Sequence, residues 1–337
     1  MVTGAAVGGR PWNAGGVAAG SLSADRVLPR SRRLGDRVGD GLLHGVTAVA
    51  ALLSLLLVAA IAWRVADGAW PAVRTFGLGF LWHDVWNAPL DRFGARDLIV
   101  GTVVTSFGAM LISAPLSIAI GLFLSELAPP TIRTPVGTLI DMLAAVPSVV
   151  VGLWGIYVLA PFDAQHVQPL LGSVLGWIPL FAHGSDHVES TVFTAMLVLA
   201  LMTIPITSSI CRELFLRVPA ELEQGAIALG ATRWETVRSI VLPSVRGGVV
   251  AAVVLGLGRA LGEAIAVTQV IGNFIPLKPS IFEPGDTIAS RLANQYQGAV
   301  STTQVAALLY LGLILLAITF ATNLAAQRVV RRFERQR

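Results

Sequence analysis

Long apolar stretches recur along this chain, and short segments between them carry most of its charged residues. A hydrocarbon layer of about 30 Å is crossed by a helix of about 20 apolar residues. Six stretches are long enough, and they predict membrane-spanning helices at about 42–66, 98–124, 136–159, 192–215, 245–271 and 305–326. The pattern therefore predicts an all-α integral membrane protein with six transmembrane helices.

The composition excludes most other classes of protein. Hydrophobic residues make up 54% of the 337 residues and charged residues only 13%, against about 25% charged in soluble domains. A soluble fold with so few charges would leave much of its surface apolar. The net charge is +4, but the basic residues flank the apolar stretches, which argues against a nucleic-acid partner. The single cysteine, Cys211, excludes an intramolecular disulfide framework.

Arginine placement predicts the orientation in the membrane. Arginines concentrate before the first stretch, between the fourth and fifth, and after the sixth, whereas the loop 161–190 has no Lys or Arg. With six spans these three regions lie on one side, and the positive-inside rule makes that side cytoplasmic. We therefore expect both termini in the cytoplasm, with a disordered tail at 1–41 and a membrane domain at 42–337, whose core is 98–326.

The segment 217–243, between the fourth and fifth stretches, is polar enough to leave the bilayer yet helically patterned. Gly230 is placed to end a first short helix, and Pro243 suits the first turn of the following span. Two short helices joined by a tight turn would project into the cytosol. An amphipathic helix lying on the membrane surface is the alternative. The two apolar faces consist of Leu222, Ala226 and Leu229, and of Trp234, Val237 and Val241.

The fifth stretch contains a charged pair, Arg259 and Glu263. Residues four apart share one helix face and can form an ion pair. A charge at the bilayer centre costs roughly 2.5–3.5 kcal/mol, so we expect both residues to face the bundle interior or a wet path. The planar guanidinium fork matches phosphate or another tetraoxyanion. The pair is either part of an anion path or a structural ion pair between helices, and Gly258 and Gly262 would let another helix approach.

Several of these segments resemble ABC importer permeases. Segment 217–243 is similar to the cytoplasmic EAA loop of that family, with Gln-Gly-Ala in place of Glu-Ala-Ala. Segments 99–106, 126–129, 143–155 and 256–263 resemble the phosphate-specific (Pst) branch, in particular its PstC-type subunits. The resemblance covers about 93–323. The residues corresponding to the EAA loop are Glu223, Gln224, Gly225, Ala226, Gly230, Ile240, Leu242 and Pro243.

The resemblance implies a type I importer permease of MetI-like fold that translocates inorganic phosphate across the bacterial cytoplasmic membrane. It implies an anion path at Arg259 and Glu263 and an EAA loop that docks on the ATPase. The implied partners are a PstA-type second permease, a PstB-type ATPase dimer and an external PstS-type phosphate-binding protein. We expect no enzymatic activity and no cofactor in this chain. The only lysine, Lys278, follows Leu277, so no Gly-Lys-Ser/Thr phosphate loop exists and ATP and Mg²⁺ would bind to the ATPase.

Other functions are compatible with parts of the pattern. A permease for molybdate, sulfate or another oxyanion would use the same chemistry. A secondary transporter often shows inverted halves, and no such symmetry is apparent. An intramembrane enzyme of lipid metabolism would need clustered acids or histidines within the spans. His183, Asp186 and His187 lie in the outer loop, and their spacing favours a solvated loop over a metal site.

Overall fold

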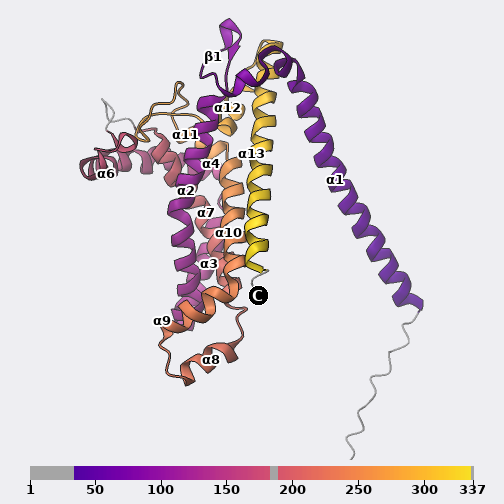
Figure 1. Cartoon of the computed structure of the whole chain (residues 1–337), viewed down its shortest axis with the longest axis vertical. Helices are drawn as coiled ribbons and strands as arrows, with labels where there is room; N and C mark the ends of the chain where they lie inside the picture. Colours follow the sequence, from indigo (N-terminus) through magenta and orange to yellow (C-terminus); the bar gives the residue numbers. More distant parts are fainter. Residues whose placement is uncertain (1–33, 183–188, 335–337) are drawn as a thin grey trace, which may run out of the picture. The chain divides into compact units, whose positions relative to one another are not determined.

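The computed structural model of the chain describes residues 34–182 and 189–334 (Figure 1). Six of the described helices are long and apolar enough to cross a membrane, which confirms the predicted number. Most of the expected tail, and the loop histidines with Asp186, lie outside the described residues. The six spans are Gly41–Leu81, Arg96–Leu127, Ser148–Leu175, Val192–Phe215, Arg233–Gly262 and Thr302–Arg331.

Helices account for nearly all regular structure in the described residues. The α-helices are α1 (Leu34–Phe76), α2 (Arg96–Leu122), α3 (Pro130–Ala144), α4 (Ser148–Trp154), α5 (Ala160–Phe162), α6 (Gln168–Leu175), α7 (Val192–Phe215), α8 (Ala220–Ala228), α9 (Arg233–Thr236), α10 (Leu242–Gly262), α11 (Ile265–Val270), α12 (Ile288–Gln295) and α13 (Thr302–Glu334). Wider π-helical turns are η3 (Phe123–Leu127), η4 (Gly155–Leu159), η5 (Asp163–Val167) and η7 (Val237–Val241), and tighter 3₁₀ turns are η1 (Gly77–Leu81), η2 (Ala88–Leu90) and η6 (Pro179–Phe181). Strands β1 (Trp86–Asn87) and β2 (Arg92–Phe93) form a short antiparallel hairpin.

Helices α2, α7, α10 and α13 pack lengthwise against one another (Figure 1). Small residues bring α2 close to α7, as expected where no hydrophobic effect drives helices together in lipid. A Cβ at Gly108 would clash with Met196, and one at Gly121 would lie 2.9 Å from Cβ of Cys211. Cys211 is buried in this contact, so it acts as a packing residue.

The chain consists of two units, which divide between Ala59 and Ala60, within α1. In the first unit, every described side chain from 41 to 59 is exposed, and most of them are apolar. Such a helix is suited to a hydrocarbon environment. The remainder of α1 belongs to the second unit, where Ala69 and Ala72 pack with Leu308 and Leu311 of α13.

The third span lies further along the chain than the sequence predicted. The expected helix 136–159 is interrupted between α3 and α4, at Ala145, Val146 and Pro147. A proline disfavours helical backbone at the residue before it, and Pro147 itself is extended (ψ 138°). The spanning helix begins at Ser148 and continues to Leu175, so the first half of the expected outer loop 161–190 is helical. Helix α3 instead packs against α7, and Ser209 of α7 donates a 2.6 Å hydrogen bond to Asp141 of α3.

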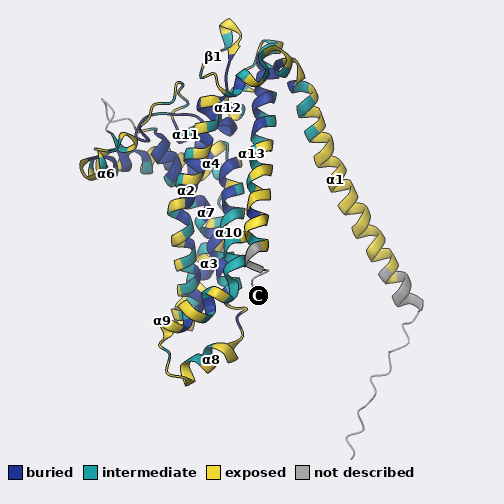
Figure 2. Ribbon diagram, in the orientation of Figure 1, coloured by how far each residue is buried: buried dark blue, intermediate teal, exposed yellow. Residues whose placement is uncertain are grey.

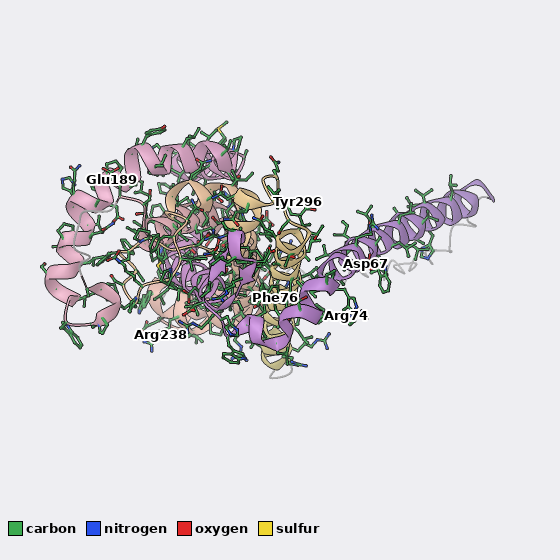
Figure 3. All side chains as sticks on the ribbon, turned by 90° about the horizontal axis from the view of Figure 1, so that it is seen from above. Asp67, Arg74, Phe76, Glu189, Arg238 and Tyr296 are labelled. Carbon is green, nitrogen blue, oxygen red and sulfur yellow. The ribbon has the colours of Figure 1, made fainter. Side chains whose placement is uncertain are left out.

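One end of the bundle carries a cluster of aromatic side chains. Phe80 stacks on Tyr310 of α13 at 4.6 Å between ring centroids, and Phe76, labelled in Figure 3, contacts Phe93 edge to face. This cluster ties the end of α1 to the β-hairpin and to the beginning of α13. Aromatic pairs of this kind contribute about 0.5–1.5 kcal/mol beyond the area they bury.

A buried ion pair lies beside this cluster and joins α12 to the segment that precedes it. The guanidinium of Arg291 lies 2.6 Å from Asp286 and 5.8 Å from the ring centroid of Trp86. Burial raises the pKa of Asp286 and lowers that of Arg291, so loss of hydration disfavours both charges. Their mutual attraction is what keeps the two charges in this dry environment.

Candidate translocation path and coupling segment

Arg259 lies near the end of α10 and faces an open cavity of about 430 Å³. Its side chain is exposed, and it makes no hydrogen bond or ion pair with any residue that the structure describes. The cavity is walled by α7, α10 and α13. Its lining residues are Ile206, Leu255, Gly258, Arg259, Thr319 and Asn323. A guanidinium with free donors in a partly polar cavity can receive an anion without first breaking an ion pair.

The predicted pairing of Arg259 with Glu263 is wrong. The sequence pattern placed both residues on one continuous helix, but α10 ends at Gly262. Glu263 has extended backbone (ψ 117°) and its side chain turns to the next helix, where Oε1 accepts a 3.4 Å hydrogen bond from the backbone N–H of Ala266. A carboxylate at the beginning of a helix is favoured by the unpaired N–H groups there. Glu263 therefore acts at the beginning of α11, separated from Arg259 by the break.

The glycines beside this break have different roles from the predicted one. Gly262 has no atom within 4 Å of a built Cβ, and Gly258 has only Asn323 at 3.8 Å. The close helix approach occurs instead at Gly256, where a Cβ would lie 2.7 Å from Oγ1 of Thr207 on α7. The tight packing is therefore on the α7 side of α10, and the cavity side stays open.

Gly230 ends the first short helix as predicted. Its φ of +91° is a left-handed conformation that costs other L-residues roughly 1–2 kcal/mol. The N–H of Gly230 donates to the carbonyl of Ile227, and the N–H of Ala231 donates to that of Ala226. These two bonds make a Schellman ending of α8. Thr232 and Glu235 then form a capping box that begins α9.

The second predicted helix is not separate from the fifth span. Helix α9, the turn η7 and α10 form one continuous helix from Arg233 to Gly262. Ile240 and Leu242 therefore lie within it, and Pro243 lies in the first turn of α10. Proline has no N–H for an α-helical bond and its ring crowds the preceding turn, which the wider π-turn directly before it accommodates.

Segment 217–243 is largely exposed along α8 and α9 (Figure 2), and several of its exposed residues are apolar. Leu229 is 92% exposed and Trp234 is 67% exposed, and Leu222 is also exposed. Gln224 and Gly225 are exposed, while Ala226 is partly buried. An apolar patch on a charged segment outside the spans is typical of an interaction surface.

Glu223 is the partly buried acid of this segment. Burial, and secondarily the negative charge of Glu126 at the end of the second span, raise the pKa of Glu223. Glu223 and Glu126 therefore lie close enough to repel each other. The two carboxylates place negative charge where the segment meets the bundle, which favours a basic group on a docking partner.

Sequence reasoning missed the contribution of the sixth span to the cavity. Thr319 and Asn323 of α13 lie four residues apart and face the same cavity as Arg259. The signal was present, because both are polar residues within a strongly apolar stretch, where polar groups usually face the bundle interior or a wet path.

Comparison with known proteins places this fold in a class. Residues 117–335 match the family described as binding-protein-dependent transport system inner membrane component. A bacterial alginate ABC transporter has a similar fold, with a TM-score of 0.58 and 17% sequence identity over 89% of this chain and 98% of that chain. The MetNI methionine ABC transporter also has a similar fold, with a TM-score of 0.52 and 16% identity over 74% of this chain and 99% of that chain. At these identities the likeness shows the fold alone. Fold and family together define a multi-pass membrane permease of an ABC importer.

Curated relatives narrow this class. The phosphate transport system permease protein PstC of Pasteurella multocida is 42% identical over 313 residues, covering 92% of this chain and 98% of the relative. The PstC proteins of Mesorhizobium japonicum and Haemophilus influenzae are 41% and 42% identical over 88% and 87% of this chain. The chain belongs to the PstC family of phosphate transport system permeases.

Proposed function

We propose that this chain translocates inorganic phosphate as one permease subunit of an ATP-driven importer. The observation that carries the proposal is the unpaired guanidinium of Arg259 in a cavity between α7, α10 and α13. A charged group in a membrane span is costly, so an unpaired one indicates a function. The names of the relatives supply phosphate as the anion. Glu263 at the nearby helix break is the second proposed path residue, because its charge would repel an anion that stayed at Arg259.

The remaining machinery is proposed to lie on other chains. A PstA-type permease would complete the path, a PstS-type protein would deliver phosphate from outside, and a PstB-type ATPase dimer would bind ATP and Mg²⁺. The exposed apolar tip of segment 217–243, with Leu229 and Trp234, supports docking of that segment on the ATPase. Glu223, Gln224, Gly225 and Ala226 lie on α8, at the side of this surface.

The proposed location is the bacterial cytoplasmic membrane, with both termini and segment 217–243 in the cytoplasm. The arginine distribution supports this orientation. The domain limits that we propose are a cytoplasmic tail at 1–41 and a permease domain at 42–337, with the core at 98–326.

Uptake of radiolabelled phosphate tests the proposal directly. Cells that lack this chain are expected to lose ATP-dependent phosphate uptake and to regain it when the chain is supplied together with its partners. Unlabelled phosphate is expected to compete, whereas sulfate and molybdate at equal concentration compete little. Competition by sulfate or molybdate equal to that by phosphate would indicate a permease for another oxyanion, and uptake without any ATPase would indicate a secondary transporter.

Replacing Gly230 by Leu is expected to weaken the attachment of the ATPase. The left-handed backbone at Gly230 would be strained by roughly 1–2 kcal/mol, and the turn between α8 and α9 would shift to relieve the strain. Co-purification of the ATPase and the ratio of phosphate imported to ATP hydrolysed are the measurements. Gly230→Asn is the matched control, because Asn tolerates left-handed backbone. Equal co-purification and coupling in all three proteins would argue against the docking role.

A further inference from the structure

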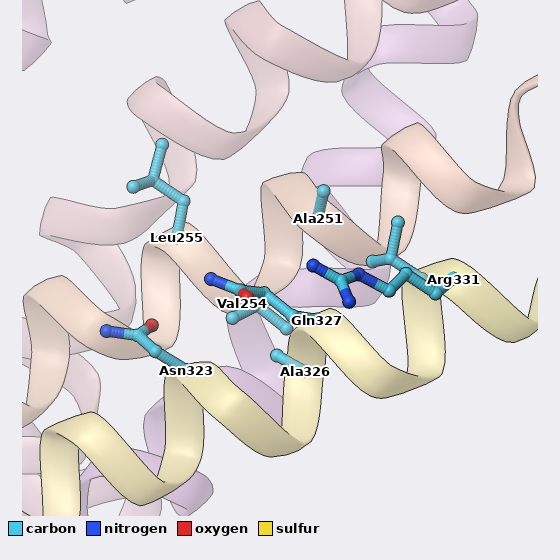
Figure 4. A pocket seen from close by; sticks show the side chains of 8 residues that line it. Ala251, Val254, Leu255, Asn323, Ala326, Gln327 and Arg331 are labelled. Atoms are coloured by element: carbon cyan, nitrogen blue, oxygen red, sulfur yellow. The ribbon is translucent and has the colours of Figure 1, made fainter.

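A second cavity of about 380 Å³ adjoins the one that contains Arg259 (Figure 4). Leu255 of α10 and Asn323 of α13 line both cavities, so the two lie side by side along the groove between these helices. The residues that line the second cavity are Ala251, Val254, Leu255, Asn323, Ala326, Gln327, Val330 and Arg331. The groove therefore extends from Arg259 toward the end of α13.

The polar side chains of the second cavity all come from one helix. Asn323, Gln327 and Arg331 are spaced four residues apart, which places them on one face of α13. They extend over eight residues of helix, or about 12 Å at 1.5 Å per residue. Figure 4 shows the guanidinium of Arg331 extending back along α13 toward Gln327. The facing wall on α10 consists of Ala251, Val254 and Leu255, which offer only apolar contact.

This arrangement fits a small anion that moves along a series of donors. An amide N–H₂ and a guanidinium both donate hydrogen bonds to phosphate oxygens, and the apolar wall opposite offers these donors no competing acceptor. In the cavity next to Arg259 the corresponding polar groups are Thr319 and Asn323. Asn323 is thus the residue at which the two arginine sites meet.

We propose that Arg331, together with Gln327 and Asn323, forms a second oxyanion site through which the anion passes between Arg259 and the end of α13. This inference rests on the proposed function, since it assigns to the transported anion a site beyond Arg259. An anionic lipid offers the same phosphate chemistry in its headgroup. The shared lining of this groove and the cavity of Arg259 favours the transported anion, because a lipid site has no need to adjoin that cavity.

The test uses the complete importer, purified with its partner chains and reconstituted in vesicles with its binding protein. Arg331→Gln is expected to lower the maximal rate of phosphate uptake about tenfold, the effect of losing one charge-assisted hydrogen bond. Arg328→Gln removes the same charge from an exposed arginine one turn earlier that lines neither cavity, and its rate is expected to stay within about twofold of wild type.

A second variant covers the case in which Arg331→Gln fails to assemble. Gln327→Glu keeps the side-chain shape but places a negative charge in the groove, and it is expected to lower uptake while the ATPase co-purifies normally. Wild-type uptake by Gln327→Glu, or equal uptake by Arg331→Gln and Arg328→Gln, overturns the inference. Absence of phosphate uptake by the wild-type complex would instead overturn the proposed function.

To distinguish a lipid headgroup from the transported anion, the same measurements are repeated in vesicles of phosphatidylcholine alone and in vesicles that also contain phosphatidylglycerol. The defect of Arg331→Gln is expected to be the same in both. A defect that appears only with phosphatidylglycerol would identify the groove as a site for a lipid headgroup and would overturn the assignment to the transported anion.

Discussion

Replacing Arg259 by Gln is expected to abolish phosphate uptake while the chain stays in the membrane and bound to its partners. Arg259 makes no ion pair or hydrogen bond within the described part of the chain, so its removal breaks no internal contact of that kind. What is lost is a bidentate donor to the anion. Two charge-assisted hydrogen bonds correspond to a decrease in uptake of at least about 100-fold.

Reconstituted vesicles give the clearest measurement, because uptake can be compared at equal amounts of assembled complex. Arg259→Lys keeps the charge but loses the planar fork, and we expect it to retain part of the activity. Arg328→Gln, which removes an exposed arginine outside both cavities, serves as the control for charge loss alone. If Arg259→Gln took up phosphate at the wild-type rate, Arg259 would have no place in the anion path.

The missing ion pair changes how Arg259 is interpreted. An arginine held by Glu263 would need to exchange one carboxylate for the passing anion. The structure instead leaves Arg259 open to its cavity and places Glu263 at the beginning of α11. The guanidinium of Arg259 is therefore free to accept an anion under the proposed function, and the acid lies beyond a helix break. A structural role is less well supported for an unpaired arginine than for one held in an ion pair.

The spans were predictable because the length of an apolar stretch is set directly by the thickness of the bilayer. The breaks within spans were not predicted well, because they depend on single residues. Pro147 directly precedes the third span, yet apolar residues continue on both sides of it, so the hydropathy pattern merged two helices. Glu263 likewise follows a glycine within an apolar stretch, and the helical spacing extended across the end of α10.

The candidate site was predictable where its chemistry stands out against an apolar background. Arg259 was identified because an arginine within a span requires an explanation. Asn323 and Gln327 are uncharged, and they line the groove only because α13 lies beside α10. No local pattern in the sequence indicates that helix pairing. The end of α8 at Gly230 was predicted because glycine favours left-handed backbone, a purely local property.

The buried pair Arg291–Asp286 gives the largest expected effect on stability. Arg291 is 6% exposed and Asp286 is 2% exposed, so water does not compensate either charge. Removing one partner of a buried pair leaves the other charge without hydration and typically costs about 3–5 kcal/mol. Replacing both by apolar residues of similar volume is often neutral, because no uncompensated charge remains.

Arg291→Met is therefore expected to lower the apparent melting temperature of the detergent-purified complex strongly, whereas the double variant Arg291→Met with Asp286→Leu recovers most of the loss. Lys278→Met is the matched control, because Lys278 pairs with Glu283 at 2.9 Å but its side chain is 51% exposed, and such surface pairs contribute about 0–1 kcal/mol. Equal melting temperatures for Arg291→Met and Lys278→Met would show that the buried pair does not hold α12 in place. A double variant as unstable as the single one would assign the stabilisation to the contact of Arg291 with Trp86 instead.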